Sequence, residues 1–516
     1  MSSPASLTWF ARHELSLSWR DFITMMTAGK PHRQMAVIIF ILIASVIMHV
    51  FAWAVIGPSL PFTESGANDQ GVLIIVTGLI ALSFSLMSSQ AMESVTRVFY
   101  ARSDLDLILS SPASTRRVFT VRIAAVAFST TMLSLLLAAP AINVLAVLHS
   151  PYWLGAYLLI FGLGIIATIF SLSLTIILFR TVGAKRTRLI SQIVAALVGA
   201  VFIIGVQLAA IASIGSVSRL DFLVSDTVRS WAPNNDSLLW IPARAAMGEP
   251  GPLMLVVISA VLLFGWAIAA FSSGFSEKVL AAAGLSQGIS KTRDRGPSFR
   301  QRGAIPTLRL KEWKLLLRDH WLISQTLMQV FYLIPPAFML WQGFGTTSAL
   351  STVIAPVLVM ASGQLAGGLA WLAISGEDAP QLVATAPVSR TSIIRAKVEA
   401  VLSAVAVLVV PILLVMAWAD MKVALVCACC ILAAAASATA IQLWFRSQAR
   451  RSNFRRRQTS SRVATFAEAF SSIFWAGSAA LWANGSLYAL VLISCALIVL
   501  AIARALRPNL TDEFLY

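Results

Sequence analysis

The sequence contains few charged residues for its length. Asp, Glu, Lys and Arg make up 12% of its 516 residues, whereas soluble domains carry roughly 25%. Hydrophobic residues make up 58% of the chain, and the mean hydropathy is +0.82. This imbalance excludes an ordinary soluble globular protein and indicates a polytopic membrane protein.

Residues that commonly form catalytic or metal sites are also scarce. The four cysteines all lie in apolar runs, so they do not form the disulfide framework of a secreted domain. The five histidines are scattered without metal-ligand spacing, and we expect neither a metal site nor a catalytic residue. No G-x-x-x-x-G-K-[ST] loop occurs, so the chain cannot cradle ATP by that route.

Carboxylates are missing from the middle of the predicted membrane spans. All 22 Asp and Glu residues lie in loops or near span ends, and Glu93, Glu399 and Glu468 come closest to entering a span. Proton-coupled carriers commonly need an ionisable group at depth, so their absence disfavours a secondary carrier. The deeper polar residues are mostly neutral, and each is a candidate for a helix-to-helix hydrogen bond or for a substrate pathway. These candidates are Asn143, Gln207, Gln329, Gln364 and Gln442.

Twelve apolar runs approach or exceed the roughly 20 residues that a bilayer-spanning helix requires. The predicted spans are 35–57, 71–91, 118–148, 152–179, 189–214, 252–273, 322–343, 350–374, 398–419, 422–445, 464–483 and 486–504. We therefore expect an all-α polytopic fold with about twelve transmembrane helices.

The basic residues are distributed asymmetrically between the two sides of this predicted topology. With the N-terminus inside, 35 of the 39 Lys and Arg residues fall in cytoplasmic segments, and only four fall outside. This asymmetry predicts that both termini are cytoplasmic. The net charge of +17 then follows from topology, and we expect no nucleic-acid partner.

A segment punctuated by proline occurs twice, each time before an apolar helix. One offset of 275 residues aligns Pro112 with Pro387, Ser114 with Ser389 and Arg122 with Lys397. Each proline restricts the chain ahead of the next helix, and each serine is positioned to cap that helix.

An amphipathic helix that lies in the membrane interface is predicted before each half. Its apolar stripe consists of Leu15, Trp19, Phe22 and Met26 in the first half, and of Leu310, Trp313, Leu317 and Trp321 in the second. Charged residues recur at matching spacing: Glu14, Arg20 and Asp21 in the first helix, and Glu312, Arg318 and Asp319 in the second.

These repeats predict two parallel six-helix halves, each preceded by an interfacial helix. The long outer stretch, about 215–251, could fold back into the interface. The expected organisation is an interfacial helix at 1–34, a first transmembrane half at 35–273, a cytoplasmic linker with the second interfacial helix at 274–321, a second transmembrane half at 322–505 and a cytoplasmic tail at 506–516.

This order of elements resembles the membrane subunit of type 2 ABC exporters in a fused two-half form. The resemblance covers nearly the whole chain. It is carried in the first half by Asp104, Asp106, Ser111, Pro112, Ser114, Arg116 and Arg117, and in the second half by Glu377, Asp378, Ala386, Pro387, Ser389 and Arg390. The second acidic run lacks the Leu-Asp-Leu pattern of the first, so the two segments are expected to bind a partner protein with different strength.

The resemblance implies that the chain is a permease subunit and not an enzyme. Residues 102–117 and 377–390 would dock on two ABC ATPase subunits, which would bind ATP and Mg, so the chain itself would hold no cofactor. It implies residence in a bacterial inner membrane and export of an amphipathic or other small molecule. Two alternatives stay open: a secondary carrier of twelve spans and, less favoured, a membrane-embedded transferase.

Overall fold

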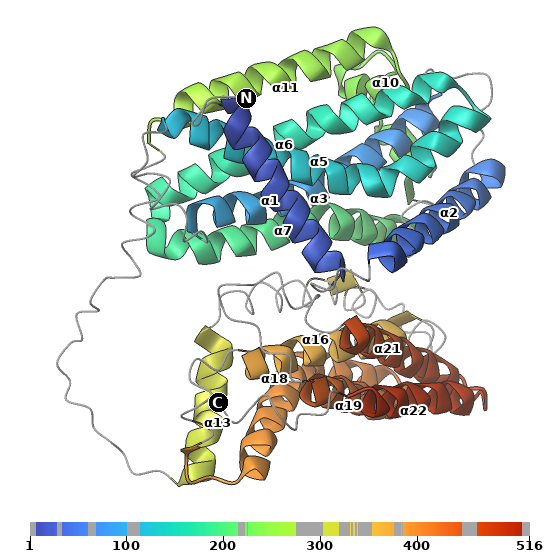
Figure 1. Ribbon diagram of the computed structural model, residues 1–516. Coiled ribbons are helices and arrows are strands. Elements are labelled where there is room, and N and C mark those ends of the chain that lie inside the picture. Colours follow the sequence, from blue (N-terminus) through green and yellow to red (C-terminus); the bar gives the residue numbers. More distant parts are fainter. Residues whose placement is uncertain are drawn as a thin grey trace. The chain divides into compact units, whose positions relative to one another are not determined.

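The computed structural model describes most of the chain. The described residues are 7–27, 34–59, 69–100, 114–214, 222–223, 225–274, 303–318, 331, 334–335, 338, 353–375, 383, 385–445 and 462–507. The chain divides into two compact units, Met1–Ser290 and Lys291–Tyr516. In both units, the regular elements of the described residues are helices (Figure 1).

The described part of the first unit consists of long apolar helices and a group of short ones near one end of them. The long helices are α1 (Leu7–Thr27), α2 (Gln34–Ser59), α3 (Gln70–Tyr100), α5 (Thr115–Leu148), α6 (Gly155–Val182), α7 (Ala184–Ile214) and α11 (Pro250–Phe271). The short ones are η3 (Pro151–Leu154), α9 (Asp226–Trp231), η4 (Leu238–Trp240) and α10 (Ile241–Ala246). Helices satisfy their own backbone hydrogen bonds, which a lipid environment demands.

Helix α3 organises the packing of the first unit. It contacts α5, α6 and α7, while α6 also packs on α11 and α1 packs on α5 (Figure 1). Toward the end of α3 that leads into residues 101–113, Phe99 packs with Phe119, Ile123 and Leu172, and all four side chains are buried. This apolar cluster joins α3, α5 and α6, so the start of α5 is held firmly against its neighbours.

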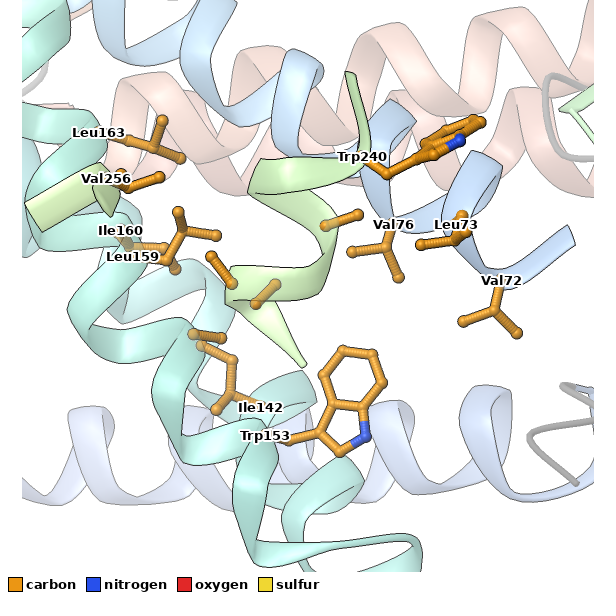
Figure 2. Close-up of a cluster of buried hydrophobic side chains, with 14 of the residues drawn as sticks. Val72, Leu73, Val76, Ile142, Trp153, Leu159, Ile160, Leu163, Trp240 and Val256 are labelled. Atoms are coloured by element: carbon orange, nitrogen blue, oxygen red, sulfur yellow. The ribbon is translucent and has the colours of Figure 1, made fainter. Parts of the chain in front are cut away.

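The described residues after α7 pack onto the helices of this unit, whereas the predicted return into the membrane interface stays a prediction. Figure 2 shows Trp240 beside Leu73 and Val76 of α3, and these residues belong to one buried cluster. The Trp240 indole nitrogen donates a 3.0 Å hydrogen bond to the Asn234 carbonyl. Buried tryptophans need such a partner. Residues 225–246 are therefore part of the folded unit.

A glycine permits this close packing at the start of α11. Gly248 has a φ of +85°, and a Cβ added there would lie 2.2 Å from the Tyr152 carbonyl oxygen. Any other residue would be strained by its backbone conformation and by this clash. Gly248 therefore fixes the turn between α10 and α11 against η3.

The described residues of the second unit form six main helices. They are α13 (Ala304–Arg318), α16 (Ala355–Ser375), α18 (Arg390–Ala419), α19 (Met421–Phe445), α21 (Arg462–Ala483) and α22 (Ala489–Ala505). Helix α16 contacts α18, α19 and α21, and α13 packs on α18 and α16 (Figure 1). Glycines in α16 let its neighbours approach closely, as is common between membrane helices.

Eight of the described helices are long and apolar enough to cross a membrane. They are α3, α5, α7, α11, α16, α18, α19 and α6 together with η3. Helices α2, α21 and α22 occupy three further predicted ranges but are not among the eight. The predicted span 322–343 lies almost wholly outside the described residues. The total of about twelve spans stays a prediction.

Candidate functional site

Ser389 begins helix α18 as a capping residue. It occupies the N-cap position with φ −64° and ψ 139°, and its hydroxyl accepts a 3.3 Å hydrogen bond from the Ser392 backbone N–H. Such a cap satisfies one of the free N–H groups at a helix start. Pro387, Ser389 and Arg390 are exposed. The predicted cap at this position is confirmed.

Ser114 occupies the corresponding position before α5. Its backbone angles, φ −67° and ψ 129°, are nearly those of Ser389, but its side chain makes no capping hydrogen bond. Its carbonyl oxygen accepts from the Arg117 N–H at 2.9 Å and begins the helix. The position of the cap is therefore as predicted, whereas the side-chain hydrogen bond is not. Arg116 and Arg117 are exposed beside it.

A buried ion pair joins α13 to α18. Glu312 has no solvent exposure, and its carboxylate accepts hydrogen bonds from Lys397 at 3.1 Å and from Lys311 at 3.2 Å. A buried carboxylate is costly unless it is paired in this way. Lys397 also donates to the Ala373 carbonyl near the end of α16. One lysine thus connects α13, α16 and α18, two turns after the Ser389 cap.

A second ion pair joins the same two helices closer to solvent. The Arg309 Nε donates to Glu399 at 2.5 Å, and Arg395 donates to the other oxygen of that carboxylate at 2.8 Å. The hydrogen bond and charge of Glu399 raise the pKa of Arg309 above its ordinary value. Arg309 is not among the residues predicted from sequence. Its position three residues before Glu312 places both on one face of α13, and this is a signal that could have found it.

Several apolar residues of the predicted interfacial helices are exposed. In α1, Leu15 and Trp19 are 50% and 64% exposed, whereas Glu14 is half-buried. In α13, Leu317 is exposed while Glu312 is buried. Exposed apolar side chains on a helix that also carries a protein-facing charge fit a helix that lies in a membrane interface.

Several predicted site residues lie outside the described structure. These are Asp104, Asp106, Ser111, Pro112, Glu377, Asp378, Asp319 and Gln329, together with the side chains of Asp21 and Arg318. Among the described members of the same set, Arg20 is exposed.

The neutral polar candidates differ in their surroundings. Asn143 of α5 accepts a 2.7 Å hydrogen bond from Tyr157 of α6, and its amide nitrogen lies 3.1 Å from His49 of α2. Gln442 of α19 donates to Glu468 of α21 at 2.6 Å. For Asn143 and Gln442 the structure thus has the helix-to-helix hydrogen bonds that the sequence offered as one alternative.

The other two described candidates, Gln207 and Gln364, are characterised by their burial. Gln207 is buried in α7, and Gln364 is half-buried in α16. Glu468 lies six residues after the start of α21, near a span end as expected, but it is only 6% exposed. Its spacing from the end of the span is visible in the sequence, but its burial depends on α16 and α19. In the described part of the chain, no three His, Cys, Asp or Glu side chains gather as a metal site.

Comparison with known proteins identifies one family. The family described as "Putative ABC exporter" matches residues 28–321, which is more than half of the chain. No curated protein and no solved structure matched the chain. The matched region spans α2 to the end of α13, and thus includes the Ser114 cap and Glu312. The chain therefore belongs to this family of ABC exporters. It is a multi-pass membrane protein that serves as a transport subunit rather than a catalytic one.

Proposed function

We propose that the chain is the permease subunit of an ATP-driven exporter, a fused form with two halves that couples to two separate ATPase subunits. Residues 102–117 and 377–390 are the docking segments, and the membrane spans of the permease form the substrate pathway. The observation that carries this proposal is the junction around Lys397, which ties the helix after the second segment to α13 and α16.

The packing of the two units supports the proposed repeat. Helix α3 contacts α5, α6 and α7, and α16 contacts α18, α19 and α21. Likewise, α1 packs on α5 as α13 packs on α18. The helix before the first segment ends at Tyr100, and the helix after it starts at Thr115. At the second segment these positions are Ser375 and Arg390. Each pair of positions differs by 275, the offset of the sequence repeat.

A docking segment must pass motion from a soluble partner to the membrane helices. Transmission of this motion requires a short connection to a helix whose first turns stay folded under load. At the second segment, Ser389 caps α18 and the buried Lys397–Glu312 pair lies two turns further on. Force applied at residues 377–390 is therefore expected to move α13 and α18 together instead of fraying α18.

The remaining parts of the proposal follow from family and composition. The ATPase partners bind ATP and Mg, and the permease contributes no cofactor site. The exported molecule is amphipathic or otherwise small, because the pathway candidates are neutral and polar among apolar spans. The permease resides in a bacterial inner membrane with both termini in the cytoplasm, as the distribution of Lys and Arg favours.

A proton-coupled secondary carrier is the second candidate, and Glu468 is the observation that favours it. Carriers of that class use ionisable groups inside spans, and Glu468 is buried among α16, α19 and α21. The family match favours the exporter. Transport by vesicles that contain the permease and ATPase separates the two functions: an exporter requires ATP, whereas a carrier works with a proton gradient alone.

Co-purification tests the docking segments directly. The double variant D104A/D106A should insert normally but lose most of its bound ATPase, because close charge pairs at a binding surface couple by about 1.5 kcal/mol or more. The corresponding variant of the second segment is E377A/D378A. D226A/D236A is the matched control, since it removes two acids from the outer segment. Undiminished ATPase binding in both docking variants would refute the assigned role of these segments.

A further inference from the structure

We propose that the groove between α13 and α18 binds the head group of an anionic phospholipid, and that Arg309 is the residue that contacts its phosphate. This inference requires that the chain spans a membrane, but it does not depend on the proposed coupling to ATPase subunits. It names a lipid ligand of stated charge for one surface of the second unit.

The groove lies within the second unit, where α13 packs beside α18 (Figure 1). Its volume is about 220 Å³. Ala396 and Ala400 stand one turn apart on α18 and are each 2% exposed, and such small side chains make room between two helices. The residues that line the groove are Arg309 and Trp313 of α13, with Ala396, Glu399, Ala400 and Ser403 of α18. Each set has helical spacing, so one face of each helix forms the groove.

The charged residues around the groove carry a net positive charge. Glu399 accepts hydrogen bonds from Arg309 at 2.5 Å and from Arg395 at 2.8 Å, so two arginines share one carboxylate. The next carboxylate along α13, Glu312, is likewise shared by two lysines. Basic pockets between membrane helices favour anionic lipid head groups. A phosphate group therefore suits this site better than an ammonium group does.

Arg309 is oriented to contact a phosphate. Its Nε is bound to Glu399, which fixes the plane of the guanidinium, and the terminal nitrogens of such a fork can bind phosphate oxygens. The Arg309 side chain is 49% exposed, so a ligand can reach it without displacing the Glu399 hydrogen bond. Glu399 is thus a positioning residue, and Arg309 is the ligand contact.

Apolar surface beside Arg309 indicates that the phosphate belongs to a lipid. Leu310 and Leu317 are 38% and 68% exposed, and their spacing from Trp313 places all three on one stripe of α13. The predicted membrane span 398–419 begins beside Glu399, with Ser403 one turn deeper. The groove is therefore expected at the boundary between head groups and acyl chains. A phospholipid satisfies both the charge and the apolar stripe, whereas free phosphate satisfies only the charge.

Two variants test the groove in different ways. Arg309→Ala removes the contact to the phosphate, and Ser403→Leu narrows the groove but keeps every charge. Arg504→Ala is the control for charge, because Arg504 is exposed on α22 at the same predicted face of the membrane. Ser494→Leu is the control for size, because the Ser494 hydroxyl donates to a carbonyl of its own helix, as that of Ser403 does. Neither control position lines the groove.

The measurement is photocrosslinking of lipids to the full-length chain in lipid nanodiscs, followed by peptide mapping. Phosphatidylglycerol and phosphatidylethanolamine probes carry the same reactive group near the glycerol. We expect the phosphatidylglycerol probe to label α13 and residues 396–403 more strongly, and R309A to reduce this excess about fivefold. S403L should also reduce it, while R504A and S494L should match the unaltered protein. Equal labelling by the two probes, or an unchanged excess in R309A, would overturn the proposal.

Competition separates a lipid site from a site for free anions. Unlabelled phosphatidylglycerol should remove the excess labelling, whereas phosphatidylethanolamine and inorganic phosphate should not. Displacement by inorganic phosphate would refute a lipid ligand, and equal displacement by phosphatidylethanolamine would refute recognition of charge. Exposed ion pairs add little to folding stability, so R309A should unfold at the temperature of the unaltered protein. If it does not, S403L decides, because unchanged labelling in that variant would exclude the groove as the site.

Discussion

Gln442 donates a 2.6 Å hydrogen bond to Glu468, and it joins α19 to α21 inside the second unit. Replacement of Glu468 by Ala leaves the amide without this acceptor, and an unsatisfied buried polar group costs about 1–3 kcal/mol. Glu468→Gln keeps an acceptor and should lose less. Glu93→Ala is the control, since Glu93 is 56% exposed and pairs only with Arg97 in the described residues. Thermal unfolding in detergent should rank Glu468→Ala as the least stable of the three.

Gly367 and Glu468 lie in such close contact that a larger residue cannot enter. A Cβ added at Gly367 would lie 2.0 Å from a Glu468 carboxylate oxygen, and a Cβ at Gly363 would lie 2.5 Å from Ser472. Gly367→Ala should therefore destabilise the unit by about 1–3 kcal/mol, the usual cost of overpacking. Gly265→Ala is the control, because that glycine has no neighbour within 4 Å. Equal unfolding midpoints for both variants would contradict this contact.

Local signals in the sequence predicted the starts of two helices correctly. Ser114 and Ser389 stand at the N-caps of α5 and α18, because a proline and a capping residue act within a few residues of the chain. The apolar runs likewise predicted the ranges of the long helices, since bilayer thickness sets their length. These features need no information about distant residues.

Contacts between distant residues could not be derived in the same way. The partner of Glu312 is Lys397, 85 residues away, and Glu399 pairs with Arg309 across a separation of 90. Both pairings depend on how α13 lies on α18. For the same reason, the burial of Glu468 near the start of α21 depends on α16 and α19 and could not be read from its position in the sequence. The sequence could name charged residues in the repeat but not their partners.

The hydrogen bonds around Asn143 favour one tautomer of His49 in the first unit. Tyr157 donates to the Asn143 carbonyl oxygen at 2.7 Å, so the amide nitrogen faces His49 Nε2 at 3.1 Å. That nitrogen must accept, and Nδ1 donates to the Ser45 carbonyl at 2.7 Å. We therefore expect a neutral ring with its proton on Nδ1. Nitrogen-15 shifts of labelled histidine, assigned with His49→Gln, check this.

Removal of the Tyr157 hydroxyl should alter that histidine. In Tyr157→Phe the Asn143 amide loses the donor that fixes its orientation, so we expect signals from both ring tautomers of His49. Tyr152→Phe is the control, because Tyr152 is an exposed residue of η3. A proton on Nε2 in the unaltered protein would refute the assignment.

The distribution of basic residues gives a direct test of topology. Because 35 of the 39 Lys and Arg residues fall on one predicted side, Ser290 is expected in the cytoplasm and Asn234 on the outer face. Reporter fusions at these two positions should give opposite signals. Equal signals would mean that no span lies between Asn234 and Ser290, and would overturn the twelve-span topology.

The fused repeat predicts the stoichiometry of the complex. Residues 102–117 and 377–390 are expected on the same face of the membrane, because six predicted spans separate them. Two ATPase subunits enclose ATP between them in transporters of this class, so one permease offers one docking segment to each. A permease dimer would present four segments to two ATPases and leave two unused. Native mass measurement of the purified complex should therefore give one permease with two ATPases, and loss of one ATPase in E377A/D378A would assign that copy to the second segment. A complex of two permeases with two ATPases would mean that one segment in each chain does not dock.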